Sequence, residues 1–194
     1  MNILEKYISE IFDFENNQDP TSFEDRSGPP EELPAVIGLI SLNFQELEEE
    51  IEKRIIQMTQ VEAKIGQIIT SELAFRNKIN LFASLYYHLK DTYHFNSLPD
   101  YEMGYLKELL KALTKCEELR NQMLHSTIKK DWKTKKIERK KVTAKAKKGL
   151  TEINQQVDIP FLYNVSDYIV SMQMELEQFF IGFKKTLPNT ADSK

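Results

Sequence analysis

The chain has 194 residues, enough for one hydrophobic core and too few for two full-sized domains. Its 41% hydrophobic and 29% charged residues are typical of globular proteins, and its longest uninterrupted apolar run, Val36 to Ile40, is too short to span a membrane. The lone Cys116 excludes an internal disulfide, and the first residues lack the basic start and cleavage site of a secretory signal. We therefore expect a cytoplasmic protein with no membrane partner.

The N-terminal part differs from the rest of the chain. Residues 1–12 carry apolar side chains at helical spacing and can form a short amphipathic helix through Ile3, Leu4, Tyr7, Ile8 and Ile11. Residues 13–34 contain Asp-Pro, Ser-Gly-Pro-Pro and Leu-Pro, which interrupt helices and strands. We expect residues 1–34 to be a short helix and a Pro-rich linker, and residues 35–194 to be one helical domain.

From Pro34 onward, apolar residues recur every three or four positions, which predicts long helices. Gly66 is expected to separate the first two, a third runs from about 102 to 128, and Asp158-Ile159-Pro160 opens the last. The sequence therefore predicts an all-α fold, an antiparallel bundle of four and up to five helices. The three apolar stripes outside the third helix are Ile40, Phe44, Leu47, Ile51, Ile55 and Met58; Phe75, Ile79, Phe82, Tyr86, Leu89 and Tyr93; and Leu162, Val165, Ile169, Met172, Leu176, Phe179 and Phe183.

A basic segment, residues 129–148, precedes the last helix. It has eleven Lys or Arg against Asp131 and Glu138, so it carries +9 while the remainder of the chain carries −13. Residues 131–158 lose helical periodicity, and we expect a short irregular or β-hairpin insertion there, with 137–142 as a strand. A basic cluster of this kind is either a solvated face or a polyanion site, and both readings stay open.

The third helix contains the residues that point to chemistry. Arg120 is centred on its apolar stripe, whereas Asn121 and His125 lie at the edge of that stripe, one turn apart. Arginine suits phosphate binding, and histidine exchanges protons near neutral pH. The amide of Asn121 is in position to hydrogen-bond the imidazole and fix its tautomer. The alternative is that Arg120 pairs with a carboxylate of another helix and His125 is a polar C-terminal residue.

Helical geometry separates the two groups. Arg120 and His125 are about 140° apart around the helix and about 7.5 Å apart along it. A shared site requires a long arginine that reaches around, a helix that unwinds near His125, or a second copy of the helix. The last option favours a homodimer whose two-fold axis passes near this helix.

An arginine, an adjacent polar residue and a histidine a few positions later, late in a helix of an all-α bundle, resemble the hallmark of the HEPN superfamily. Arg120, Asn121 and His125 match this motif, and the similarity also covers the helices around NFQELEEEIEKRI and AFRNKINLFASL. It spans roughly residues 35–185. One branch of toxins, the nucleotidyltransferase-paired type, has a tyrosine two residues after the histidine. Here that position is Thr127, so regulation through such a tyrosine is not supported.

The resemblance implies a metal-independent endoribonuclease, a toxin or defence effector, with a composite active site at a homodimer interface. His125 would be the general base or acid for the ribose 2′-OH, Arg120 would hold the scissile phosphate, and Asn121 would orient the pair. The products would carry 2′,3′-cyclic phosphate and 5′-hydroxyl ends. An antitoxin or regulatory protein is a further expected partner, and DNA is not.

The basic segment supplies candidate RNA contacts, because lysines bind phosphates without regard to sequence. Trp132 either stacks on a base or closes the end of the bundle. No cofactor is expected, and no Cys, His or carboxylate cluster has metal-ligand spacing. The second hypothesis is a non-catalytic interaction or immunity-type module whose acidic face, residues 46–52, binds a basic partner. The candidate RNA-binding residues are Lys129, Lys130, Trp132, Lys133, Lys135, Lys136 and Arg139.

Overall fold

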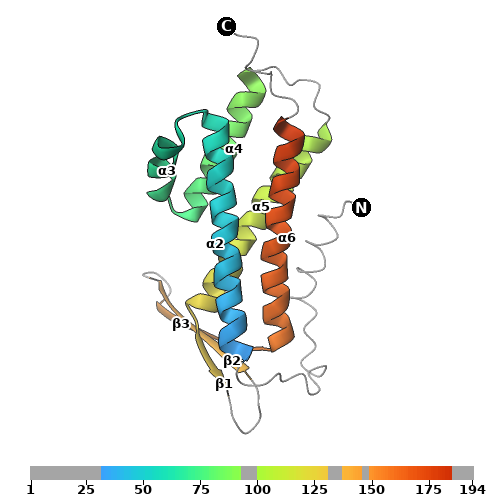
Figure 1. The fold of residues 1–194 in the computed structure, drawn as a ribbon. Coiled ribbons are helices and arrows are strands. Elements are labelled where there is room, and N and C mark those ends of the chain that lie inside the picture. The colour runs from blue at the N-terminus through green and yellow to red at the C-terminus, as the bar shows by residue number, and fades with distance from the viewer. Residues whose placement is uncertain (1–31, 93–99, 131–136, 146–148, 185–194) are drawn as a thin grey trace. The chain divides into compact units, whose positions relative to one another are not determined.

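The computed structural model describes residues 32–92, 100–130, 137–145 and 149–184. These residues are mostly helical, as predicted, with a small antiparallel sheet whose second and third strands lie where the insertion was expected (Figure 1). The expected N-terminal helix and most of its linker lie outside the described residues. In chain order the elements are α2 (Glu32–Thr59), α3 (Ala63–Ser71), α4 (Phe75–Thr92), α5 (Asp100–Leu124), β1 (Thr127–Lys130), β2 (Ile137–Lys145), β3 (Gly149–Val157) and α6 (Ile159–Lys184).

The described chain divides into two compact units, and α2, α5 and α6 each contribute to both. The first unit comprises described residues within 32–44 and 116–170, and the second comprises those within 45–115 and 171–184. The three predicted apolar stripes are confirmed as core wherever they are described, except for the half-buried Leu89. Each stripe is buried because its members return to one side of the helix every three or four residues.

In the first unit, the three-stranded sheet has the order β1-β2-β3. The β2–β3 ladder runs without interruption from the pair Ile137 and Val157 to the pair Lys145 and Gly149. Ile137, Arg139 and Val157 are buried, so one face of the sheet is turned inward and the alternate residues are turned outward. Asp158 then caps α6, since its Oδ1 accepts a hydrogen bond of 2.7 Å from the Phe161 backbone N–H. The predicted start of the last helix is thereby confirmed.

In the second unit, Gly66 has a different role from the one predicted. It lies inside α3 and is buried, and a Cβ placed on it would be 2.6 Å from Ile56 Cγ1 of α2. The glycine therefore permits close packing of α3 on α2 and does not end a helix. The break occurs earlier, at Gln60, whose φ of 54° is in the left-handed region that commonly ends helices.

Helix direction in the second unit also departs from simple alternation. Figure 1 shows the α2 and α4 segments running the same way and the α5 segment running the opposite way. The short α3 returns the chain between α2 and α4, a connection that the sequence prediction lacked because it placed a single break, at Gly66, between the first two helices. Aromatic rings of α4 and α6 meet in this unit: the Phe82 and Phe179 centroids are 6.2 Å apart, and those of Tyr86 and Phe183 are 5.0 Å apart.

Candidate functional site

The motif lies where α5 ends, earlier than predicted. The helix stops at Leu124, and β1 begins at Thr127. Residues 127 and 128, which were expected to end the helix, therefore belong to a strand. The last helical hydrogen bond of this end runs from the His125 backbone N–H to the Asn121 carbonyl, at 3.1 Å. His125 is therefore the first residue beyond the helix, beside the negative end of its dipole.

Arg120 is held from two sides within the first unit. Its Cζ lies 5.2 Å from the centroid of the Phe44 ring, a cation–π contact with α2. Its Nη1 donates a hydrogen bond of 2.9 Å to Asn121 Oδ1. The side chain is half-buried, and its Nε is buried without a hydrogen-bond partner in the described part of the chain. The guanidinium is thus oriented while some of its five N–H donors stay unused.

No carboxylate of the described residues forms an ion pair with Arg120. The alternative role for this arginine, a pair with an acidic residue from another helix, therefore gains no support within those ranges. Phe44 was predicted as core, yet its contact with Arg120 was not. Helical spacing identifies each stripe separately and does not say which residues of two helices meet.

Asn121 and His125 do not pair as expected. The Asn121 side-chain oxygen accepts from Arg120, and the exposed imidazole of His125 has no hydrogen bond to either residue in the described chain. The structure therefore brings Arg120 and Asn121 together and leaves His125 accessible at the surface. An exposed imidazole just past a helix end is open to a second molecule, whether substrate or another protein chain.

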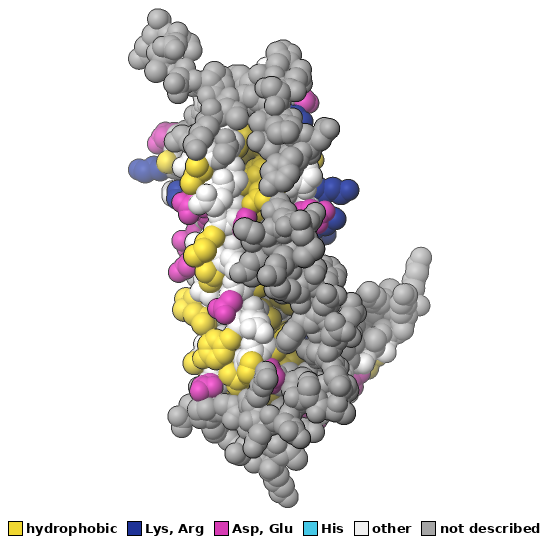
Figure 2. Space-filling model, turned by 90° about the vertical axis from the view of Figure 1, so that its right-hand side faces the viewer, with side chains coloured by type: hydrophobic (Ala, Val, Ile, Leu, Met, Phe, Trp, Pro, Cys, Tyr) yellow, Lys and Arg dark blue, Asp and Glu magenta, His cyan; other side chains and the backbone are white. Residues whose placement is uncertain are grey.

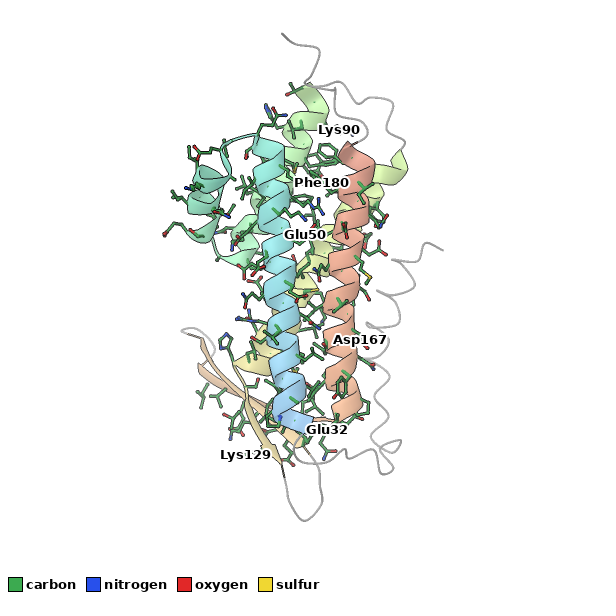
Figure 3. The ribbon with its side chains drawn as sticks, viewed as in Figure 1. Glu32, Glu50, Lys90, Lys129, Asp167 and Phe180 are labelled. Carbon is green, nitrogen blue, oxygen red and sulfur yellow. The ribbon has the colours of Figure 1, made fainter. Side chains whose placement is uncertain are left out.

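The candidate RNA-binding residues divide into three groups. Lys129 is exposed on β1 (Figure 3), and nothing is described of the Lys130 side chain on the same strand. Arg139 is only 5% exposed, so its position does not fit the expected contact with RNA. The remaining candidates, Trp132, Lys133, Lys135 and Lys136, lie outside the described residues.

Arg139 instead joins the sheet to α5. Its Nη1 donates to Gln122 Oε1 at 3.1 Å, and its Nη2 donates to Gln155 Oε1 of β3 at 2.5 Å. The two glutamines were not identified from the sequence. The available signal was the alternation in β2, where Ile137 and Arg139 fall on the same side as every second residue. A basic residue on the inward side of a sheet needs polar partners, and these amides provide them.

The outward face of the sheet carries both positively and negatively charged side chains. Lys129 lies opposite Glu138 in the β1–β2 ladder, and Lys140 Nζ is 2.5 Å from Glu152 Oε1 of β3. The hydrogen bonds from Lys140 and then from Asn154 lower the pKa of Glu152. The net charge of +9 in the basic segment therefore does not describe this face, where each of these two lysines has an acidic neighbour.

Two further ionisable groups of the first unit are buried and unsuited to chemistry at neutral pH. Burial raises the pKa of the Cys116 thiol. Burial, and then the nearby Cys116, raise the pKa of the Tyr168 hydroxyl. Both groups stay protonated, which is unfavourable for a nucleophile or a metal ligand.

The described ranges contain no cluster of three or more His, Cys, Asp or Glu arranged to hold a metal ion. No helix within those ranges is long and apolar enough to cross a membrane. Comparison with known proteins found no matching protein-family model, no matching curated protein and no matching solved structure.

Proposed function

We propose that the chain is a metal-independent endoribonuclease of the HEPN type, acting as a homodimer with a composite active site. In this proposal Arg120 binds the scissile phosphate, Asn121 holds the guanidinium in position, and His125 moves the proton of the attacking ribose 2′-OH. The proposal includes a HEPN-like arrangement of the helices. Cleavage would leave 2′,3′-cyclic phosphate and 5′-hydroxyl ends.

The observation that carries the proposal is the state of Arg120. Its guanidinium is oriented by Asn121 and Phe44 and has no carboxylate partner among the described residues. A guanidinium held in one orientation with free donors suits a phosphate, which accepts two parallel hydrogen bonds from an arginine. The exposed imidazole of His125 supports the same function, because a general base must reach the substrate.

The second hypothesis, a module that binds a basic partner through the acidic face of residues 46–52, is less well supported. Three acids of this face are already engaged inside the second unit. Lys78 Nζ lies 2.5 Å from both Glu48 Oε1 and Glu52 Oε1, and Glu50 pairs with Arg54. A face whose charge is partly balanced by its own chain offers less attraction to a basic partner.

Cleavage of single-stranded RNA in the presence of EDTA tests the activity. We expect cyclic-phosphate ends with the wild-type protein and loss of cleavage with His125→Ala. His88→Ala is the matched control, since His88 is also an exposed histidine but lies on α4. Cleavage that persists in His125→Ala would show that the proposed base is not used, and circular dichroism would establish that both variants are folded.

Mixing two inactive variants tests the composite site. Arg120→Gln retains His125, and His125→Ala retains Arg120, so a mixed dimer has one site with both groups if the site spans two chains. Random mixing makes about half the dimers mixed, so we expect about a quarter of wild-type activity to return. Failure to recover activity, with mixed dimers present by mass spectrometry, would place the site within one chain.

A further inference from the structure

The first unit has an apolar surface formed by α2 and α6 together. Leu39 and Leu42 of α2 are 37% and 61% exposed, and Tyr163 of α6 is 39% exposed. Val170 of α6 is half-buried. A single exposed leucine is ordinary, but several apolar side chains on neighbouring helices mark a contact surface. We call these four residues the α2–α6 face.

The four residues lie on the same side of the helix pair. Asn43 Nδ2 donates a hydrogen bond of 2.7 Å to Ser166 Oγ, which marks the line where α2 and α6 touch. Both helix segments run in the same direction in this unit (Figure 1). At about 100° per residue, Leu39 and Leu42 lie about 40° and 100° to one side of Asn43, and Val170 and Tyr163 lie about 40° and 60° to the opposite angular side of Ser166.

When two parallel helices lie side by side, residues on their shared outer side are turned clockwise from the contact line on one helix and anticlockwise on the other. These residues therefore share one outward side, and the buried Ile40 and Ile169 occupy the inward side. Figure 2 shows exposed hydrophobic side chains among acidic ones on the face that it presents, and Figure 3 places the exposed Asp167 on α6.

The size of the α2–α6 face argues against a second copy as its occupant. Its side chains expose on the order of a few hundred Å², judged from the 150–250 Å² that a whole large aromatic side chain buries. A stable dimer requires about 800 Å² from each partner. A single short helix matches the available area better.

We propose that residues 1–12 of the same chain form a helix that docks on the α2–α6 face. Ile3, Leu4, Tyr7, Ile8 and Ile11 fall within an arc of about 140° on a helical projection, a width typical of a helix with one buried side. A helix of this length is marginal alone in water and needs an apolar surface to pack against. The α2–α6 face supplies one.

The chain length permits this docking without strain. Residues 13–31 connect the segment to Glu32, the first residue of α2, and Leu42 lies about 15 Å further along that helix. Nineteen residues reach at most about 60–70 Å when fully extended, well beyond this distance. Attachment to the same chain raises the effective concentration of the segment to near the millimolar range, so modest affinity suffices.

The exposed isoleucines of α3 are the rival surface. Ile65, Ile68 and Ile69 are exposed on this nine-residue helix of the second unit. The α2–α6 face presents two helices side by side, so a third helix can contact both. This face also includes α2, the helix that directly follows residues 13–31 in the chain. A substitution on α3 therefore serves as the matched control for one on α2.

Hydrogen exchange of the full chain, read by mass spectrometry, tests the docking. We expect backbone amides within residues 3–11 to exchange at least about tenfold more slowly than in an unstructured peptide. Leu42→Asp should remove this protection, and Ile68→Asp should leave it unchanged. The two positions are comparable, since Leu42 is 61% and Ile68 is 68% exposed. Amides of the α2 core, Phe44 to Ile51, report whether each variant is folded.

Every other outcome overturns the proposal. Absence of protection in the wild-type chain would mean that the segment does not dock. Protection that survives Leu42→Asp in a folded variant, or is lost in Ile68→Asp, would place the segment elsewhere. Protection that falls on dilution would identify a second copy as the occupant. None of these results depends on ribonuclease activity, so the two proposals fail independently.

Discussion

Each unit has a cationic side chain near its core, and the two side chains have different partners. In the first unit, Arg120 is oriented by an aromatic ring and an amide and has no carboxylate partner in the described chain. In the second unit, Lys78 is only 4% exposed and lies between the carboxylates of Glu48 and Glu52. Burial alone would lower the pKa of Lys78, but the hydrogen bonds and charges of these two acids outweigh it and raise the pKa.

The difference distinguishes a structural cation from an available one. Arg54 of the second unit behaves like Lys78: it is buried, pairs with Glu50 and lies 4.8 Å from the Phe180 ring centroid. Arg54 and Arg120 both stack on an aromatic ring, and only Arg54 has an acidic partner among the described residues. A cation with an internal counter-charge contributes to stability, whereas one without a counter-charge can bind an external anion.

Removing the charge of Arg120 should have the largest effect, and chiefly on activity. We expect Arg120→Gln to lower the rate of RNA cleavage by about 10²–10³-fold, the usual cost of removing a group that stabilises developing charge. Its thermal midpoint should fall by only a few degrees, because the cation–π contact with Phe44 is lost but no ion pair of the described chain is broken. Arg76→Gln, on the exposed side of α4, is the control. A large loss of stability in Arg120→Gln would mean that the arginine is structural.

Removing the charge of Lys78 should do the reverse. We expect Lys78→Met to lower the free energy of unfolding by about 2–3 kcal/mol, because Glu48 and Glu52 are left close together without a cation. The expected cost is below that of a fully buried pair, since both acids are partly exposed. Urea unfolding measures it, and cleavage at a temperature where the variant is folded should be unchanged. If Lys78→Met loses activity while folded, the two units are not functionally distinct.

Asn121→Ala tests how far activity depends on the position of the Arg120 guanidinium. The substitution removes the hydrogen bond that holds Nη1, so we expect cleavage to fall about tenfold, equivalent to about 1.4 kcal/mol. The Michaelis constant and kcat should be measured separately, since a mispositioned arginine mainly lowers kcat. An equal loss in Gln122→Ala would instead indicate a general disturbance of the end of α5.

Two helical glycines extend the comparison to the backbone. Gly66→Ala of the second unit places a Cβ 2.6 Å from Ile56, and we expect about 1–2 kcal/mol of destabilisation. Gly38→Ala of the first unit meets nothing within 4 Å, and we expect about 0.5–1 kcal/mol of stabilisation. Thermal unfolding of both variants gives the signs. Equal effects would mean that the close contact between α3 and α2 does not constrain the fold.

The helices could be predicted because each depends on a local pattern. The residues from Ile40 to Met58 repeat with helical spacing, and so do those from Leu162 to Phe183. Gly66 was misjudged because a glycine that ends a helix and one that permits close packing look alike in sequence. The end of α5 was placed too late, since nothing local distinguishes Thr127 and Ile128 as strand until the pairing with β2 is known.

The site was predictable in its residues and not in their contacts. Arg120 stood out because an arginine in the middle of an apolar stripe is unusual. Its contact with Phe44 depends on how α2 and α5 pack, which spacing within one helix does not contain. Arg139 was assigned to RNA on composition alone, although its place beside Ile137 in a strand determines that it points inward.

The burial of Cys116 makes spectroscopic work on this protein simple. Its thiol is fully buried, and its raised pKa keeps it in the unreactive protonated form. Maleimide or spin-label reagents should therefore bypass it and modify only a cysteine introduced at an exposed position such as Lys129. A probe on β1, four residues after His125, can then be attached in the native background, with no need to replace a core residue first.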